Sequence, residues 1–159
     1  MLQRMIRAAR LDVEFYETVE HDRGYTGEAF FVVVVTALLW GIGQWILPGT
    51  RFWGSVVGGV VGAVAGWVMW AFITNIVGKQ LGGTSDTGEM LRVLGYASSP
   101  MALGIVPGIG HLVGAVWALV ASVVAVRQGQ DFTTGKAVGT IVIGWIVYVV
   151  ARGILGFIF

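Results

Sequence analysis

The sequence predicts an all-α integral membrane protein with five transmembrane helices preceded by an N-terminal amphipathic helix. Of its 159 residues, 56% are hydrophobic and only 12% are charged, whereas soluble domains average about 45–50% apolar and about 25% charged residues. The apolar residues also gather in long segments separated by short polar turns, as expected of chains that cross a bilayer. These observations together indicate that lipid, rather than a soluble core, covers most of the apolar surface.

Residues 1–28 are predicted to form a cytoplasmic amphipathic segment. Apolar residues recur there at the i, i+3, i+4, i+7 spacing of one helical face, and arginines occupy the other faces of its first half. Such a helix can lie in the headgroup plane with its arginines on anionic lipid, or it can pack on the protein's own loops. The long apolar segment that follows favours the membrane surface. The stripe consists of Leu2, Met5, Ile6, Ala9, Val13 and Tyr16.

Residues 29–159 are predicted to form the five-helix membrane domain. The first span, residues 30–47, has a length of about 27 Å at ~1.5 Å per residue, close to the thickness of a hydrocarbon core. Pro48, Gly49 and Thr50 end it. The remaining spans are expected over residues 54–77, 91–106, 110–126 and 137–159.

The third span is the shortest, and it carries Pro100 in its middle. A proline inside a helix removes one backbone hydrogen bond and frees the carbonyl four residues earlier, here that of Tyr96. Ser98 and Ser99 stand beside it, where their hydroxyls are positioned to satisfy freed backbone groups that lipid cannot reach. We therefore expect a kink or a break at this point.

Basic residues divide unevenly between the two ends of the predicted spans. Eight of the ten fall before the first span or in the turns after the second and fourth, Arg152 lies inside the fifth span, and Arg51 alone is on the opposite side. All nine acidic residues share the side of the eight. The positive-inside rule then predicts a cytoplasmic N-terminus and an external C-terminus. The charged face indicates that any soluble partner approaches from the cytoplasm.

Glycines recur at every fourth residue of the second span. Such rows allow helices to approach closely in lipid, and a weaker row opens the fourth span, so we expect the two rows to meet within one chain; contact with a second copy is the alternative. The helix-packing glycines are Gly54, Gly58, Gly62, Gly66, Gly110 and Gly114.

A polar stretch before and within the third span is the candidate partner or lipid site. Glu89, Arg92 and Tyr96 follow at helical spacings of three and four, which places an acid, a base and a phenol on one face. The alternative is that they anchor the helix end, with Arg92 paired to Glu89 and Tyr96 in the interfacial belt. The full candidate site is Asp86, Glu89, Arg92, Tyr96 and Pro100.

Several functions are excluded by what the sequence lacks. There is no cysteine, and His21 and His111 fall on opposite sides of the predicted membrane, so we expect no metal site and no cofactor. Motifs of hydrolases, zinc proteases and phosphate-binding loops are absent. We therefore predict no catalytic residue and no enzymatic activity. The net charge of +1 gives no reason to expect nucleic acid as a partner.

The stretch from Gly95-Tyr96 to Pro100, after a glycine-bearing polar loop, resembles the Ypt/Rab-GTPase-interacting protein (Yip) domain family. Residues 114–117 and the segment 131–137 before the last span are also similar to the family, the latter to its bacterial members. The resemblance covers most of the chain from about Tyr16. It implies five helices with a cytoplasmic N-terminus and, since the loops are compact, a prokaryotic-type member in a bacterial cytoplasmic membrane.

Two functional hypotheses follow. The first is a non-enzymatic membrane scaffold or accessory subunit that organises membrane or partner proteins through its cytoplasmic face, with the bilayer, a membrane protein or a second copy as partners. The second is a pathway for lipid or a small solute through the helix bundle. Few ionisable residues and no internal repeat lie in the spans, which disfavours transport.

Overall fold

The computed structural model describes the backbone of residues 1–158 and the side chains of residues 1–150. Helices account for every regular element within this part of the chain. Two short helices, α1 (Leu2–Ala9) and α2 (Val13–His21), come first. The remaining elements follow in chain order: α3 (Tyr25–Trp45), the π-helix η1 (Trp53–Gly58), α4 (Gly59–Gln80), α5 (Thr87–Ala97), the 3₁₀ helix η2 (Ser99–Ile105), α6 (Ile109–Gly129) and α7 (Thr134–Ile158).

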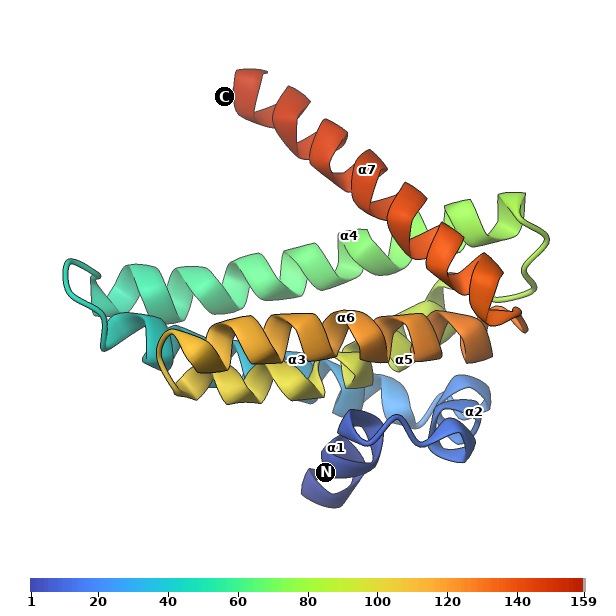
Figure 1. The fold of residues 1–159 in the computed structure, drawn as a ribbon, viewed down its shortest axis with the longest axis horizontal. Coiled ribbons are helices and arrows are strands. Elements are labelled where there is room, and N and C mark those ends of the chain that lie inside the picture. The colour runs from blue at the N-terminus through green and yellow to red at the C-terminus, as the bar shows by residue number, and fades with distance from the viewer. Residues whose placement is uncertain (159) are drawn as a thin grey trace.

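The four segments α3, α4, α5–η2 and α6 run along the longest axis of the molecule (Figure 1). The turns after α3 and η2 lie at one end of this bundle. The turns after α4 and α6 lie at the other end, beside α2, and α7 leaves from there and diverges from the bundle. We call this second end the charged end, because it carries α2 and the turns with most of the ionisable residues.

Three helical stretches are long and apolar enough to cross a membrane by length and composition: Tyr25–Trp45, Trp53–Gln80 and Ile109–Gly129. The apolar part of α7 within the described side chains, Thr134–Val150, is shorter. Apolar residues on the outer faces of these helices are exposed, including Val61, Phe72 and Leu112. Outward-facing apolar side chains are expected where the surrounding solvent is lipid.

The N-terminal segment differs from the single amphipathic helix predicted for it. It forms two helices because Leu11 adopts a positive φ of 62° between them. Met5, Phe15 and Val19 are buried in the protein's own hydrophobic core, whereas Leu2 and Ile6 stay exposed. Part of the predicted apolar stripe is therefore used to dock this segment on the bundle.

The predicted third span is broken, as Pro100 indicated. Helix α5 ends at Ala97, and the tighter η2 continues the chain. The Ser99 hydroxyl donates a hydrogen bond to the Tyr96 carbonyl at 2.6 Å, and Ser98 donates to the Gly95 carbonyl at 2.6 Å. The two serines thus satisfy the carbonyls that the break exposes, which confirms the expectation.

Candidate functional site

Asp86 and Glu89 form the N-terminal cap of α5. The Glu89 amide donates to Asp86 Oδ1 at 2.8 Å, and the Asp86 amide donates to Glu89 Oε2 at 2.7 Å. This reciprocal capping box satisfies two amides that the first turn of a helix leaves without partners. The role of both carboxylates is therefore to start α5 at the polar loop.

Arg92 binds α2 rather than Glu89. Its Nε donates to the Val19 carbonyl at 3.0 Å and its Nη2 donates to the Glu20 carbonyl. Both carbonyls belong to the last turn of α2, where helical carbonyls lack partners and a cation is favoured by the helix dipole. The side chain is almost fully buried, with 4% exposed. The predicted pairing with Glu89 is wrong: none of the ion pairs among the described residues involves Arg92.

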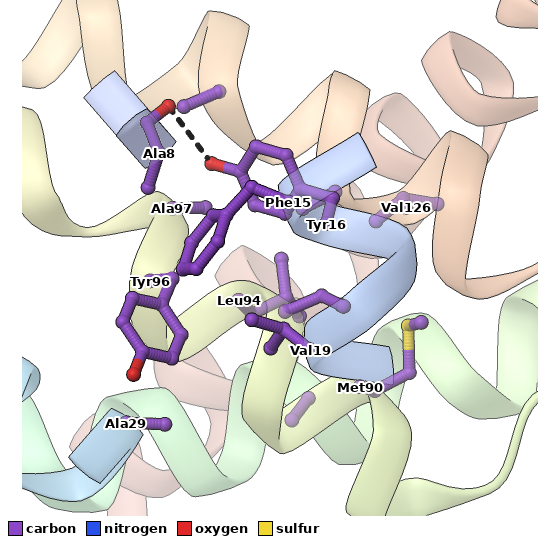
Figure 2. Packing of buried hydrophobic residues seen from close by; sticks show 14 of the residues in the cluster. Ala8, Phe15, Tyr16, Val19, Ala29, Met90, Leu94, Tyr96, Ala97 and Val126 are labelled. Atoms are coloured by element: carbon purple, nitrogen blue, oxygen red, sulfur yellow. Dashed lines mark hydrogen bonds between the residues drawn. The ribbon is translucent and has the colours of Figure 1, made fainter. Parts of the chain in front are cut away.

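Tyr96 lies in the core rather than in an interfacial belt. Its ring meets Phe15 edge-on at 5.0 Å and Tyr25 at 6.2 Å, and none of the residue is exposed. Figure 2 shows it between Phe15 and Ala29, with Tyr16 nearby. The Tyr16 hydroxyl donates to the Ala8 carbonyl at 3.2 Å, whereas the buried Tyr96 hydroxyl lies beside the Glu28 carboxyl group without a well-formed hydrogen bond.

The five residues of the predicted site do not converge on one ligand position. Asp86 and Glu89 cap α5, Arg92 holds α2, and Tyr96 fills the aromatic core. Pro100 is buried where η2 meets α6, and its carbonyl lies against Gly114. The stretch instead joins α2, the core and α6 through α5 and the start of η2.

Charged contacts hold α1 on the bundle, and the sequence reasoning missed them. Arg4 forms an ion pair with Glu28 at the start of α3 and stacks 5.0 Å from the Tyr25 ring. Arg7 Nε donates to Asp12 Oδ2 at 2.6 Å, which lowers the pKa of the Asp12 carboxyl. Asp12 also caps α2 by accepting from the Phe15 amide. Because the contacts with the bundle join residues distant in sequence, helical spacing gave no signal for them.

The polar loop of residues 81–86 is fixed by side chains from three directions. Asn75 of α4 donates to Thr87 at 2.9 Å and accepts from Ser85 at 3.1 Å. Thr84 donates to Asp131 at 2.7 Å. Lys136 of α7 donates to the Leu81 carbonyl at 3.1 Å. The turns after α4 and α6 and the start of α7 therefore form one connected surface at the charged end.

Glu20 is a buried carboxyl at this surface. Burial is the main cause that raises the pKa of Glu20 to about 7; His21 lowers this pKa, and the carboxylates of Asp131, Glu89 and Glu17 add to the rise. A buried carboxylate among like charges favours the protonated form. The charge of the docked α2 thus changes near neutral pH.

The two predicted glycine rows do not meet. A Cβ at Gly54, Gly58, Gly62 or Gly66 would have nothing within 4 Å, so no described part of the chain covers this row. Gly110 and Gly114 do allow a close approach, but to η2: a Cβ at Gly114 would lie 2.9 Å from the Pro100 carbonyl oxygen. The expected contact between the second and fourth spans within one chain is wrong.

Close packing occurs at glycines that the sequence did not single out. A Cβ at Gly41 would lie 2.6 Å from the Ser55 carbonyl oxygen, and one at Gly95 would lie 2.9 Å from Ala29 Cβ. A Cβ at Gly43 would clash with the Gly104 carbonyl oxygen of η2, and one at Gly104 would clash with the Trp40 ring of α3. These glycines stand singly rather than in a repeating row, so spacing alone does not reveal them.

Within the described residues no group of three or more His, Cys, Asp or Glu side chains is placed to hold a metal ion. The apolar spans, the helical architecture and the structural use of the polar stretch define an all-α membrane protein. A family model for the Yip1 domain matches residues 11–155, and the chain belongs to this family of membrane proteins. The match confirms the resemblance drawn from the sequence. Searches of curated proteins and of solved structures gave no match.

Proposed function

We propose that the protein is a non-enzymatic membrane scaffold or accessory subunit that binds a partner protein through its charged end. The observation that carries this proposal is the connected surface described above. Asn75, Thr84 and Lys136 tie the turns together. Arg92 and Gln128 hold α2 beside them, the latter by donating to Glu17 at 3.0 Å. A surface fixed before binding loses less entropy when a partner docks.

The same proposal includes five membrane crossings with the charged end in the cytoplasm of a bacterial cell. The segment α5–η2 contributes 11 and 7 residues, and at ~1.5 and ~2.0 Å per residue these span roughly 30 Å. This equals the thickness of a hydrocarbon core. The charge asymmetry between the two ends supports the orientation.

Site-specific photo-crosslinking in native membranes tests the scaffold role. The chain contains no cysteine, so a single introduced cysteine fixes the position on this chain at which the crosslinker is attached. Glu14→Cys and Gln80→Cys label exposed positions of the charged end, and Arg51→Cys labels the opposite end. We expect the same protein adduct from the first two positions and not from Arg51→Cys. Capture of lipid alone at all three positions would contradict the proposal.

A second candidate function is a lipid pathway along the bundle. It is favoured by one observation, an apolar groove of about 520 Å³ that runs between α4 and α6. Vesicles with the reconstituted protein would then exchange labelled lipid between leaflets faster than protein-free vesicles. Equal rates in the two preparations would remove this candidate.

A further inference from the structure

The groove between α4 and α6 is the larger of the two described pockets. Its volume is about 520 Å³, and residues of α3, α4, α5, η2, α6 and α7 line it. Trp145 of α7 stands at its side, and α7 diverges beyond it (Figure 1). Interiors of proteins are close-packed, so an open groove of this size between helices offers room for an occupant. The lining includes Val33, Ala63, Gly66, Leu94, Ala118 and Trp145.

The serine and threonine hydroxyls in the groove are already used. Thr36 donates to the Val33 carbonyl at 3.0 Å, and Ser122 donates to the Ala118 carbonyl at 2.8 Å. Ser98 donates to the Gly95 carbonyl. The groove has room for roughly 17 waters at about 30 Å³ each, but a stable water needs two to four polar partners. The lining therefore favours an apolar occupant.

The length of the groove distinguishes an acyl chain from a membrane-spanning helix. Along α4 it extends from Gly59 to Trp70, a length of roughly 16 Å at ~1.5 Å per residue. This is about half of a ~30 Å hydrocarbon core, which is the length of one lipid chain in one leaflet.

We propose that the groove is a binding site for one acyl chain of a bilayer phospholipid, held between α4 and α6 beside the indole of Trp145. The lipid completes the packing of α4 and α6 where α7 diverges. Its headgroup stays outside the groove, so the site selects for a chain rather than for a headgroup. The inference does not depend on the scaffold role or on lipid transport, because a chain that stays bound fulfils it.

Native mass spectrometry of the full-length protein tests this site. The protein is reconstituted in vesicles of phosphatidylcholine and phosphatidylglycerol and then extracted in mild detergent. We expect one retained phospholipid per chain of either headgroup. Ala63→Trp places an indole in the groove, and we expect at least a tenfold loss of the lipid adduct.

The matched control is Ala65→Trp, since Ala65 is exposed on the same helix and does not line the groove. A second pair is Gly66→Trp against Gly62→Trp; neither glycine has a neighbour within 4 Å of a Cβ, and only Gly66 lines the groove. Circular dichroism and thermal unfolding verify that all variants fold. Equal adducts in filled and control variants, or no adduct on the wild-type protein, would overturn the proposal. Disulfide-linked dimers of Ala63→Cys would also overturn it by showing a second copy in the groove.

Discussion

At the residue scale, Arg92 and Tyr96 lie one helical turn apart on α5 and are both buried, but they differ in the hydrogen bonds that their polar groups make. The Arg92 guanidinium donates to two carbonyls at the end of α2. The Tyr96 hydroxyl lies beside the Glu28 carboxyl group but makes no well-formed hydrogen bond. Because a buried polar group costs free energy unless it is paired, the two side chains should respond differently to substitution.

Arg92→Ala should lower the free energy of unfolding by about 2–3 kcal/mol, because it leaves the Val19 and Glu20 carbonyls without their donor. Thermal unfolding in detergent measures the loss, and limited proteolysis should show faster cleavage within α2. Arg23→Ala is the control, since Arg23 is exposed. Equal effects of the two substitutions would show that Arg92 does not anchor α2.

Tyr16→Phe and Tyr96→Phe form a matched pair, since both residues have no exposed surface. Tyr16→Phe removes the hydrogen bond to Ala8 and should cost about 1 kcal/mol. Tyr96→Phe removes a buried hydroxyl that lies beside the Glu28 carboxyl group without a well-formed hydrogen bond, so it should cost less than Tyr16→Phe. The unfolding temperatures of the two variants, each compared with wild type, test this prediction. A larger decrease for Tyr96→Phe than for Tyr16→Phe would show that the Tyr96 hydroxyl makes a stabilising hydrogen bond.

Glu20 should make stability depend on pH. Burial raises its folded-state pKa from 4.5 to about 7, so the folded protein binds more protons than the unfolded chain between these values. Stability should fall as pH rises from about 4.5 to about 7 and then level off. Glu20→Gln should unfold at a higher temperature than wild type at pH 8 and at a similar one at pH 4. The exposed Glu14→Gln should follow the wild-type profile.

At the element scale, the break between α5 and η2 was predictable from sequence because its causes are local. Pro100 cannot continue the helix, and Ser98 and Ser99 supply the replacement hydrogen bonds within three residues. The docking of α2 was not predictable in this way. Arg92 donates to carbonyls more than 70 residues away in sequence. Glu89 is only three residues away and has the opposite charge, so helical spacing suggested it as the partner instead.

The glycines show the same limit for helix packing. A glycine row indicates that a helix face permits close contact, but it does not say which helix arrives. In this chain the row on α4 stays uncovered by described residues, while the single glycines Gly41 and Gly95 make close approaches. Which element packs against a glycine-bearing helix face depends on the arrangement of the neighbouring elements and not on the spacing of the glycines.

Gly114→Leu and Gly62→Leu should therefore behave differently. A side chain at Gly114 meets the Pro100 carbonyl, and overpacking of this kind costs about 1–3 kcal/mol or more. Gly62→Leu meets nothing within the described chain and should leave the unfolding temperature unchanged. Size-exclusion chromatography adds a second readout: a smaller particle for Gly62→Leu would show that the row contacts another copy.

At the scale of the whole molecule, hydropathy and composition were sufficient to predict an all-α membrane protein. Three helical stretches are long and apolar enough to cross a membrane, and the family match agrees with the resemblance of the segment around Tyr96 and Pro100. The contacts between helices and turns within the bundle could not be predicted from the sequence. Side chains at the charged end are fixed by contacts between separate turns, such as Thr84 with Asp131, and these depend on the folded arrangement.

The central claim is that the chain crosses the bilayer five times with its charged end in the cytoplasm. Labelling of single cysteines with a membrane-impermeant maleimide tests it most directly, because the chain has no native cysteine. We expect Arg51→Cys to react in intact cells, and Glu14→Cys and Gln80→Cys to react only in inverted vesicles, with a tag after residue 159 accessible from outside. Reaction of Arg51→Cys and Gln80→Cys from the same side, or a cytoplasmic C-terminal tag, would contradict the account.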